Sequence, residues 1–213
     1  MDRSPLTNGW LENNDYKHFT CSKERTNGYM IVIGDSLLHH VRKPSTTPRE
    51  SVETYVESIG GCTIDRLTAL IKQNHFSELF LNQQHLIIVI GTNNLAREKS
   101  QPTIVKCEKL LQLIRRKYSS LRTIGVCTVP TRTKRSVFYR TYGDNGGKSI
   151  RKRIESYNRK LKRLSRKQTP SKCLEVIKLD FDLSIHVAKD GLHPNAAGIE
   201  HISNVLQAYA DSL

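Results

Sequence analysis

The sequence lacks any long apolar run. Its longest runs, such as residues 86–90, are only long enough for a strand, whereas a helix that spans a bilayer needs about 20 apolar residues. Residues 1–27 also lack the apolar stretch that a secretory signal requires. These absences argue against a membrane-spanning or secreted chain and favour an intracellular location, in the cytoplasm or the nucleus.

Clustered cysteines are also missing. The five cysteines are scattered, at Cys21, Cys62, Cys107, Cys127 and Cys173. An odd and dispersed set argues against a disulfide framework or a zinc site, and reduced thiols fit an intracellular chain. Internal repeats, zinc knuckles and coiled-coil heptads are absent as well. A length of 213 residues then suggests one domain over 28–213, preceded by a polar tail or linker over 1–27.

Positive charge is present in excess, but it is concentrated. The net charge is +14, and residues 131–167 contain 14 Lys and Arg against two acids. The rest of the chain is nearly balanced, with 20 basic and 18 acidic residues. The chain therefore resembles a neutral domain that carries one basic stretch.

Apolar runs alternate with helical patterns along the domain. Strands are predicted at 29–33, 51–59, 86–90, 123–127 and 174–179, and helices after Thr63, from Pro102, across 150–164 and from Pro194. Such alternation is typical of the α/β class, in which helices cover both faces of a parallel sheet of about five strands. The carboxyl ends of the strands then share one edge, where ligand sites of such sheets lie.

Ser36 lies at the end of the first predicted strand, in the run Gly34-Asp35-Ser36. A serine at a strand-to-helix turn exposes its hydroxyl, and its own N–H can face an incoming carbonyl oxygen. The hydroxyl becomes an effective nucleophile only when a neighbouring base takes its proton. Taken alone, the run is better explained as a simple helix cap.

A candidate base occurs in the run Asp190-Gly191-Leu192-His193, just before the last predicted helix. An acid three residues before a histidine can reach one imidazole nitrogen within the same turn. It would fix the tautomer and leave Nε2 to face a serine. The alternative is a helix entry in which His193 or Asn195 caps the chain around Pro194.

Two further runs could supply donors to an oxyanion. Asn93 follows the third predicted strand, and its amide can donate a hydrogen bond. Gly61 follows the second, where a glycine can bring a backbone N–H close to the same oxygen. Each run alone is also typical of an ordinary turn. Because all the motifs lie beside strand ends or the last helix, we expect them to meet at one sheet edge.

The order serine, glycine, asparagine and Asp-x-x-His resembles that of the GDSL/SGNH hydrolases, over about residues 29–213. This resemblance implies a three-layer α/β/α fold similar to flavodoxin, and hydrolysis of carboxylic esters through an acyl-enzyme. It makes Ser36 the nucleophile, His193 the base and Asp190 the residue that orients the base. The Ser36 N–H, the Gly61 N–H and the Asn93 side chain would form the oxyanion hole. The implied substrate is a small-molecule or lipid ester of a short acyl or acetyl group, with no metal and no organic cofactor.

The sequence departs from the family pattern at two positions. Asn94 stands where the third block usually ends in aspartate, which leaves the preceding donor, Asn93, unchanged. Cys62 stands where a polar residue is common. Its thiol could reshape the pocket or make it sensitive to oxidation, although a small buried residue is the simpler interpretation.

The basic stretch also has two interpretations. Aromatic residues (Phe138, Tyr139 and Tyr142) interleave its first cations, 144–147 is predicted to be a turn, and a helix follows. The helix carries Arg151, Lys152, Arg153, Arg159, Lys160, Lys162 and Arg163. With its apolar side inward, these cations form one patch that predicts binding to nucleic acid or another polyanion. The alternative is a solvated surface helix.

An esterase with a basic surface and a polar tail is also similar to the esterase domains of first-open-reading-frame proteins of non-LTR retrotransposons. The same motifs resemble those of platelet-activating-factor acetylhydrolases. The first resemblance implies association with RNA or membranes. Two hypotheses result: an active esterase, or a nucleic-acid-binding module on an esterase scaffold with weak or vestigial hydrolysis. Retention of Ser36 and His193 favours the active enzyme.

Overall fold

Five parallel strands form the centre of the computed structural model, which describes residues 29–41, 53–81, 83–133, 143–166 and 174–213. The strands are β1 (Tyr29–Gly34), β2 (Glu53–Ser58), β3 (His85–Val89), β4 (Thr123–Cys127) and β5 (Leu174–Ile177), in the spatial order β2-β1-β3-β4-β5. The predicted α/β class with a parallel five-stranded sheet is confirmed. The predicted tail over 1–27 lies outside the described residues.

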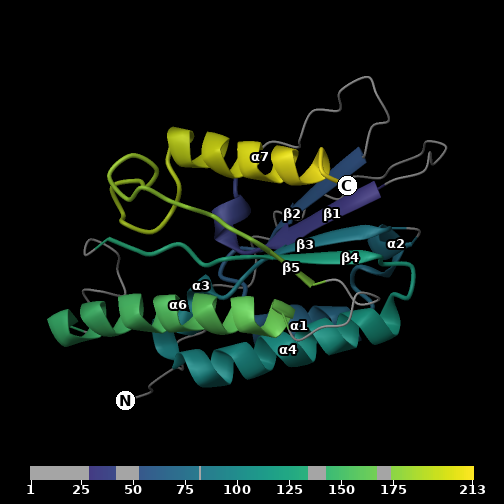
Figure 1. Ribbon diagram of the computed structural model, residues 1–213, viewed down its shortest axis with the longest axis horizontal. Coiled ribbons are helices and arrows are strands. Elements are labelled where there is room, and N and C mark those ends of the chain that lie inside the picture. The colour runs from purple at the N-terminus through teal and green to yellow at the C-terminus, as the bar shows by residue number, and fades with distance from the viewer. Residues whose placement is uncertain (1–28, 42–52, 82, 134–142, 167–173) are drawn as a thin grey trace, which may run out of the picture.

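Helices cover both faces of this sheet (Figure 1). The face below it carries α1 (Ile64–Lys72), α4 (Ser100–Lys117) and α6 (Gly143–Arg166), whereas α7 (Ala196–Ala210) and the 3₁₀ turn η1 (Ser36–Leu38) lie on the other. Two short helices, α2 (Ser77–Phe80) and α3 (Thr92–Arg97), complete the described chain. Within the described ranges, no helix is long and apolar enough to cross a membrane.

The core is divided by the sheet into two apolar clusters. Side chains of a strand alternate between the two faces. Ile31 and Ile33 of β1 accordingly belong to the larger cluster, packed by α1, α4 and α6, while Met30 and Val32 belong to the smaller one beneath α7. Both faces of β1 are therefore buried, which explains why its sequence is continuously apolar.

The structure corrects the predicted turn at 144–147, because α6 already begins at Gly143. Each glycine in a helix interior costs only about 1 kcal/mol. Farther along, α6 buries a complete stripe formed by Ile150, Ile154, Tyr157 and Leu161. Packing of a long amphipathic helix therefore outweighs a local preference for a turn.

Several element boundaries also differ from the prediction by one or two residues, and for two of them the structure shows the reason. β5 ends at Ile177 and not at 179, because the Leu179 N–H donates to Thr128 Oγ1 at 2.9 Å and so leaves the strand ladder. The last helix begins at Ala196 and not at Pro194. Asn195 caps it, since its Oδ1 accepts the Gly198 N–H at 3.0 Å.

Candidate active site

The turn that carries Ser36 is fixed between two strands. The Asp35 N–H donates to Val89 O of β3 at 2.9 Å, and the Ile59 N–H donates to Gly34 O at 2.9 Å. A Cβ at position 34 would lie 2.4 Å from Val89 O, so only glycine fits there. Asp35 Oδ1 accepts the Leu37 N–H at 3.0 Å and caps η1. The cap interpretation is therefore correct for Asp35, and the cap holds Ser36 at the first position of the turn.

His193 lies next to Ser36 in space, although 157 residues separate them in sequence. Its Nε2 is 3.1 Å from Ser36 Oγ, and its Nδ1 is 2.5 Å from Asp190 Oδ2. Asp190 Oδ1 accepts the N–H groups of Leu192 at 2.9 Å and His193 at 3.0 Å. The structure thus brings the three predicted residues into one hydrogen-bonded chain, Asp190–His193–Ser36.

The acid of this chain is held in its ionised form. Burial alone would raise the pKa of Asp190, but the N–H groups of Leu192 and His193, together with the imidazole, hold the pKa below its usual value. The side chains of His193 and Asp190 are 42% and 45% exposed. The pair is therefore open to solvent and accessible to a substrate.

A short antiparallel bridge between Val187 and Pro194 shapes the loop that carries Asp190 and His193. Inside it, the Ala188 N–H donates to His193 O at 2.8 Å. The loop packs closely on α7, where a Cβ at Gly198 would lie 2.1 Å from His186 O. These contacts fix the position of the imidazole relative to the sheet edge.

The two candidate oxyanion donors that lie outside the Ser36 turn come from neighbouring turns. The Cys62 N–H donates to Ile59 O at 3.1 Å and closes a tight turn in which Gly61 adopts φ +64°, a conformation that favours glycine. Asn93, in the first turn of α3, donates from Nδ2 to Cys62 O at 3.0 Å. An amide nitrogen carries two protons, so this bond orients Asn93 and leaves a second donor for an oxyanion.

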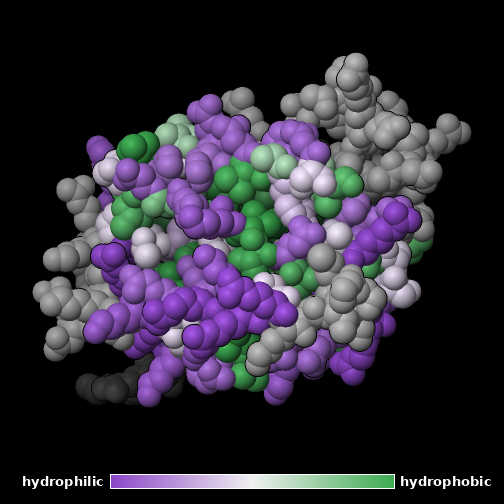
Figure 2. Space-filling view, viewed as in Figure 1, coloured by the Kyte–Doolittle hydropathy of each residue, from purple (hydrophilic) through white to green (hydrophobic). Residues whose placement is uncertain are grey.

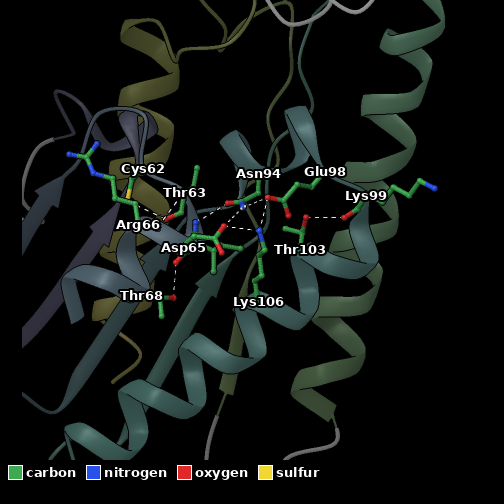
Figure 3. A network of polar contacts seen from close by, with 11 residues as sticks. Cys62, Thr63, Asp65, Arg66, Thr68, Asn94, Glu98, Lys99, Thr103 and Lys106 are labelled. Carbon is green, nitrogen blue, oxygen red and sulfur yellow. Dashed lines mark hydrogen bonds and ion pairs between the residues drawn. The ribbon is translucent and has the colours of Figure 1, made fainter. Parts of the chain in front are cut away.

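Asn94 forms hydrogen bonds that hold the surrounding structure together (Figure 3). Its Oδ1 accepts the Ile64 N–H at 2.8 Å and anchors the start of α1, while its Nδ2 lies 3.4 Å from Asp65 Oδ2 and 3.2 Å from Glu98 Oε1. Lys106 Nζ contacts the same two carboxylates, at 2.8 and 2.7 Å. An aspartate at position 94 would add a third negative charge and remove the donor. An amide at position 94 therefore fits this polar network better than an aspartate would.

Cys62 is a small buried residue. Like Cys107 and Cys127, it is buried and free. Burial raises the pKa of the Cys62 thiol to about 12, and the Asp35 charge acts in the same direction, against the lowering effect of Arg66. A protonated thiol is a poor nucleophile and is resistant to oxidation. The simpler of the two interpretations of Cys62 is therefore the better one.

Sequence reasoning missed one residue at this edge. Arg132 belongs to the basic stretch by sequence, yet it is buried. Its Nη2 donates to Thr92 O at the start of α3, and the next N–H, that of Thr133, donates to Gly191 O at 3.0 Å. Arg132 follows β4 just as Ser36 follows β1, so its place after a strand was the signal that could have identified it.

The cations of α6 from Arg151 onward divide into two groups. Arg151, Lys152, Arg159, Lys162, Arg163 and Arg166 are exposed, and Figure 2 shows a hydrophilic band over this helix. In contrast, Arg153 Nη1 lies 3.5 Å from Ala96 O and Lys160 Nζ contacts Gln101 Oε1, so both lean toward α3 and α4. The predicted aromatic residues Phe138, Tyr139 and Tyr142 lie outside the described residues.

No protein family and no curated protein matches the chain by sequence, whereas solved structures do match its fold. A member of the lipolytic G-D-S-L family from Veillonella parvula gives a TM-score of 0.63 at 15% identity, over 87% of this chain and 99% of that one. A family 3 carbohydrate esterase from Talaromyces cellulolyticus gives 0.60 at 14% identity, over 87% and 97%. A lipase from a goat rumen metagenome gives 0.62 at 16% identity, over 85% and 97%. The chain therefore has the α/β fold found in GDSL/SGNH hydrolases, as the motifs predicted.

Proposed function

We propose that the chain is a serine-dependent carboxylic ester hydrolase. The observation that carries this proposal is the continuous contact from Asp190 through His193 to Ser36, with Nε2 at 3.1 Å from the serine oxygen. A hydroxyl within hydrogen-bond reach of an oriented imidazole is the geometry that activates a serine nucleophile. The fold, shared with esterases and lipases, adds support.

Acylation begins when Ser36 Oγ attacks the acyl carbonyl and His193 Nε2 takes the serine proton. The Asp190 carboxylate stabilises the imidazolium that forms. Negative charge develops on the carbonyl oxygen, where the Ser36 N–H, the Gly61 N–H and the second Asn93 proton would donate. The imidazolium then gives its proton to the leaving alcohol, and an acyl-enzyme remains on Ser36.

Deacylation repeats these steps with water. His193 takes a proton from a water molecule, which attacks the acyl carbon through a second tetrahedral intermediate, and Ser36 leaves with the proton. None of these steps requires a metal ion or an organic cofactor. The histidine and its acid are open to solvent, so an ester can reach them. We propose short acyl or acetyl esters of a small molecule or lipid as substrates.

The proposal is tested by a reagent that needs no knowledge of the substrate. A fluorophosphonate should phosphonylate one site, Ser36, because only a serine activated by a base reacts readily. Intact-mass measurement and peptide mapping identify the site. The His193→Ala variant should react far more slowly. Labelling spread over several serines, or no faster in the wild type than in this variant, would contradict the proposal.

We propose a second function, binding of nucleic acid, for the exposed face of α6. The observation that favours it is the set of six exposed cations Arg151, Lys152, Arg159, Lys162, Arg163 and Arg166. Residues 151–166 hold one acid, Glu155, which pairs with Arg151 at 2.9 Å. Residues 151–166 span about 22 Å of helix, enough to contact several phosphates. The closer resemblance to retrotransposon proteins stays a prediction.

This second proposal predicts a specific salt dependence. Replacing Arg159, Lys162 and Arg163 by glutamine should weaken binding of a single-stranded RNA and reduce the slope of log K against log salt by about 2, since each lost phosphate contact contributes about 0.7. Fluorescence anisotropy across a salt series measures both quantities. The control replaces Lys72, Lys109 and Arg116, which are exposed on α1 and α4. Equal effects in the two triple variants, or binding to anionic vesicles alone, would overturn it.

A further inference from the structure

A second carboxylate lies buried beside the proposed nucleophile. Asp35 is 0% exposed, and its Oδ1 accepts the Leu37 N–H. Among the described residues, its Oδ2 has no hydrogen-bond partner. Ionising such a group costs free energy, because water no longer solvates the charge. A serine or asparagine would cap the same turn without this cost, so capping alone does not explain an aspartate here.

Charged groups from two other segments act electrostatically on Asp35. Arg132, which follows β4 and is 4% exposed, and His193, in the loop before α7, both lower the pKa of the Asp35 carboxyl through their charges. The thiol of Cys62 is also close enough for the Asp35 charge to raise its pKa. Arg132 is held in place by its bond to Thr92 O. The carboxylate therefore lies within electrostatic range of a buried cation and of the proposed base.

The balance of these effects places the pKa of Asp35 near neutral pH. Burial raises the pKa of Asp35 to about 7, against the lowering effects of the Leu37 N–H, Arg132 and His193. Groups with such displaced pKa values gather at functional sites. A residue that reduces stability near neutral pH is also more readily explained by activity than by folding.

We propose that Asp35 is a positioning residue of the active site, which caps the turn of Ser36 and supplies a negative charge, balanced by Arg132, that favours the imidazolium of His193 during proton transfer. This inference rests on the proposed esterase function. His193 becomes positive only as the serine proton is transferred, so a fixed negative charge nearby stabilises the transition state more than the ground state. Arg132 acts by keeping that carboxylate ionised.

The Asp35→Asn variant separates charge from capping, because its amide oxygen can still accept the Leu37 N–H. We expect kcat/KM at pH 8 to fall about tenfold, the equivalent of one pKa unit of lost interaction. In the wild type, protonation of Asp35 near pH 7 should steepen the acidic side of the kcat/KM profile. In Asp35→Asn, kcat/KM should fall less steeply with decreasing pH. The pH at which kcat/KM is half its maximum should also be lower than in the wild type. The exposed Asp211→Asn is the matched control and should leave the profile unchanged.

Arg132 variants should move the profile in the opposite direction. In Arg132→Met the Asp35 carboxyl loses its counter-ion and binds a proton more readily, so the acidic side should shift to higher pH. Arg132→Lys retains the charge and should restore the wild-type profile. This pair of variants keeps the test informative even if Asp35→Asn fails to fold.

Stability provides an independent readout of the same charge. Because folding raises the pKa of Asp35, this carboxyl binds more protons in the folded than in the unfolded chain between about pH 4 and pH 7, and its contribution to stability declines as the pH rises through that window. Asp35→Asn cannot show this decline. Its urea midpoint relative to the wild type should therefore rise between pH 5 and pH 8, whereas loss of a purely structural contact would shift the midpoint equally at both values.

The outcomes separate the proposed esterase function from the proposed role of Asp35. If the wild type hydrolyses esters while Asp35→Asn and Arg132→Met keep the wild-type pH profile, the role of Asp35 is overturned and the esterase remains. If the wild type neither hydrolyses esters nor reacts with a fluorophosphonate, the proposed function fails and the role of Asp35 fails with it.

Discussion

Ser36→Ala should lower kcat for p-nitrophenyl acetate by at least about 10⁴-fold, because loss of a nucleophile removes the covalent route altogether. The substitution removes one oxygen, whose contact in the structure is with His193 Nε2 at 3.1 Å. The free energy of unfolding should change by no more than about 1 kcal/mol, the net value of one hydrogen bond. Steady-state kinetics and urea unfolding measure the two effects.

Ser119→Ala is the matched control for this experiment, because Ser119 is an exposed serine that follows α4. It should leave both kcat and stability unchanged. A Ser36→Ala variant that folds and retains more than a tenth of the wild-type kcat would show that another group carries the reaction.

Asn93→Ala should lower kcat by about 10²–10³-fold with little change in KM, as expected when one oxyanion donor is lost. KM changes little because the donor acts on charge that develops only in the transition state. The variant also loses the bond from Nδ2 to Cys62 O, so a loss of about 1 kcal/mol in stability is expected as well. Steady-state kinetics on the folded fraction separates the two effects.

Asn94→Ala provides the comparison, because Asn94 is adjacent in sequence yet bonds to Ile64, Asp65 and Glu98. Its truncation should destabilise the fold by about 1–3 kcal/mol, since a buried N–H loses its acceptor. The kcat of the folded fraction should remain close to that of the wild type. Equal losses of kcat in the two variants would contradict a specific role for Asn93.

Much of the candidate site could be predicted because parallel strands turn sequence order into spatial proximity. Ser36, Gly61 and Asn93 each follow a strand, and the register that pairs Gly34 with Ser58 and Val89 brings these strand ends together. The three-residue spacing of Asp190 and His193 allowed their contact to be predicted. What the sequence could not provide was the distance from His193 to Ser36, which depends on how the last loop packs on α7.

The features that were missed depend on burial. Arg132 resembles its basic neighbours in sequence, and only the fold distinguishes a buried guanidinium at the sheet edge from the exposed cations of α6. The sequence around Asp35 similarly predicts only a helix cap, and its proposed second role depends on the charged groups that surround it. The start of α6 at Gly143 was missed because local preferences for turns are weaker than the packing of a long helix.

The most direct test of the account is steady-state hydrolysis of p-nitrophenyl acetate by the purified wild-type chain. Oriented contact among Asp190, His193 and Ser36 predicts saturable release of p-nitrophenol that pre-treatment with a fluorophosphonate abolishes. A folded protein whose rate does not exceed that of buffer, or whose rate survives phosphonylation of Ser36, would contradict it.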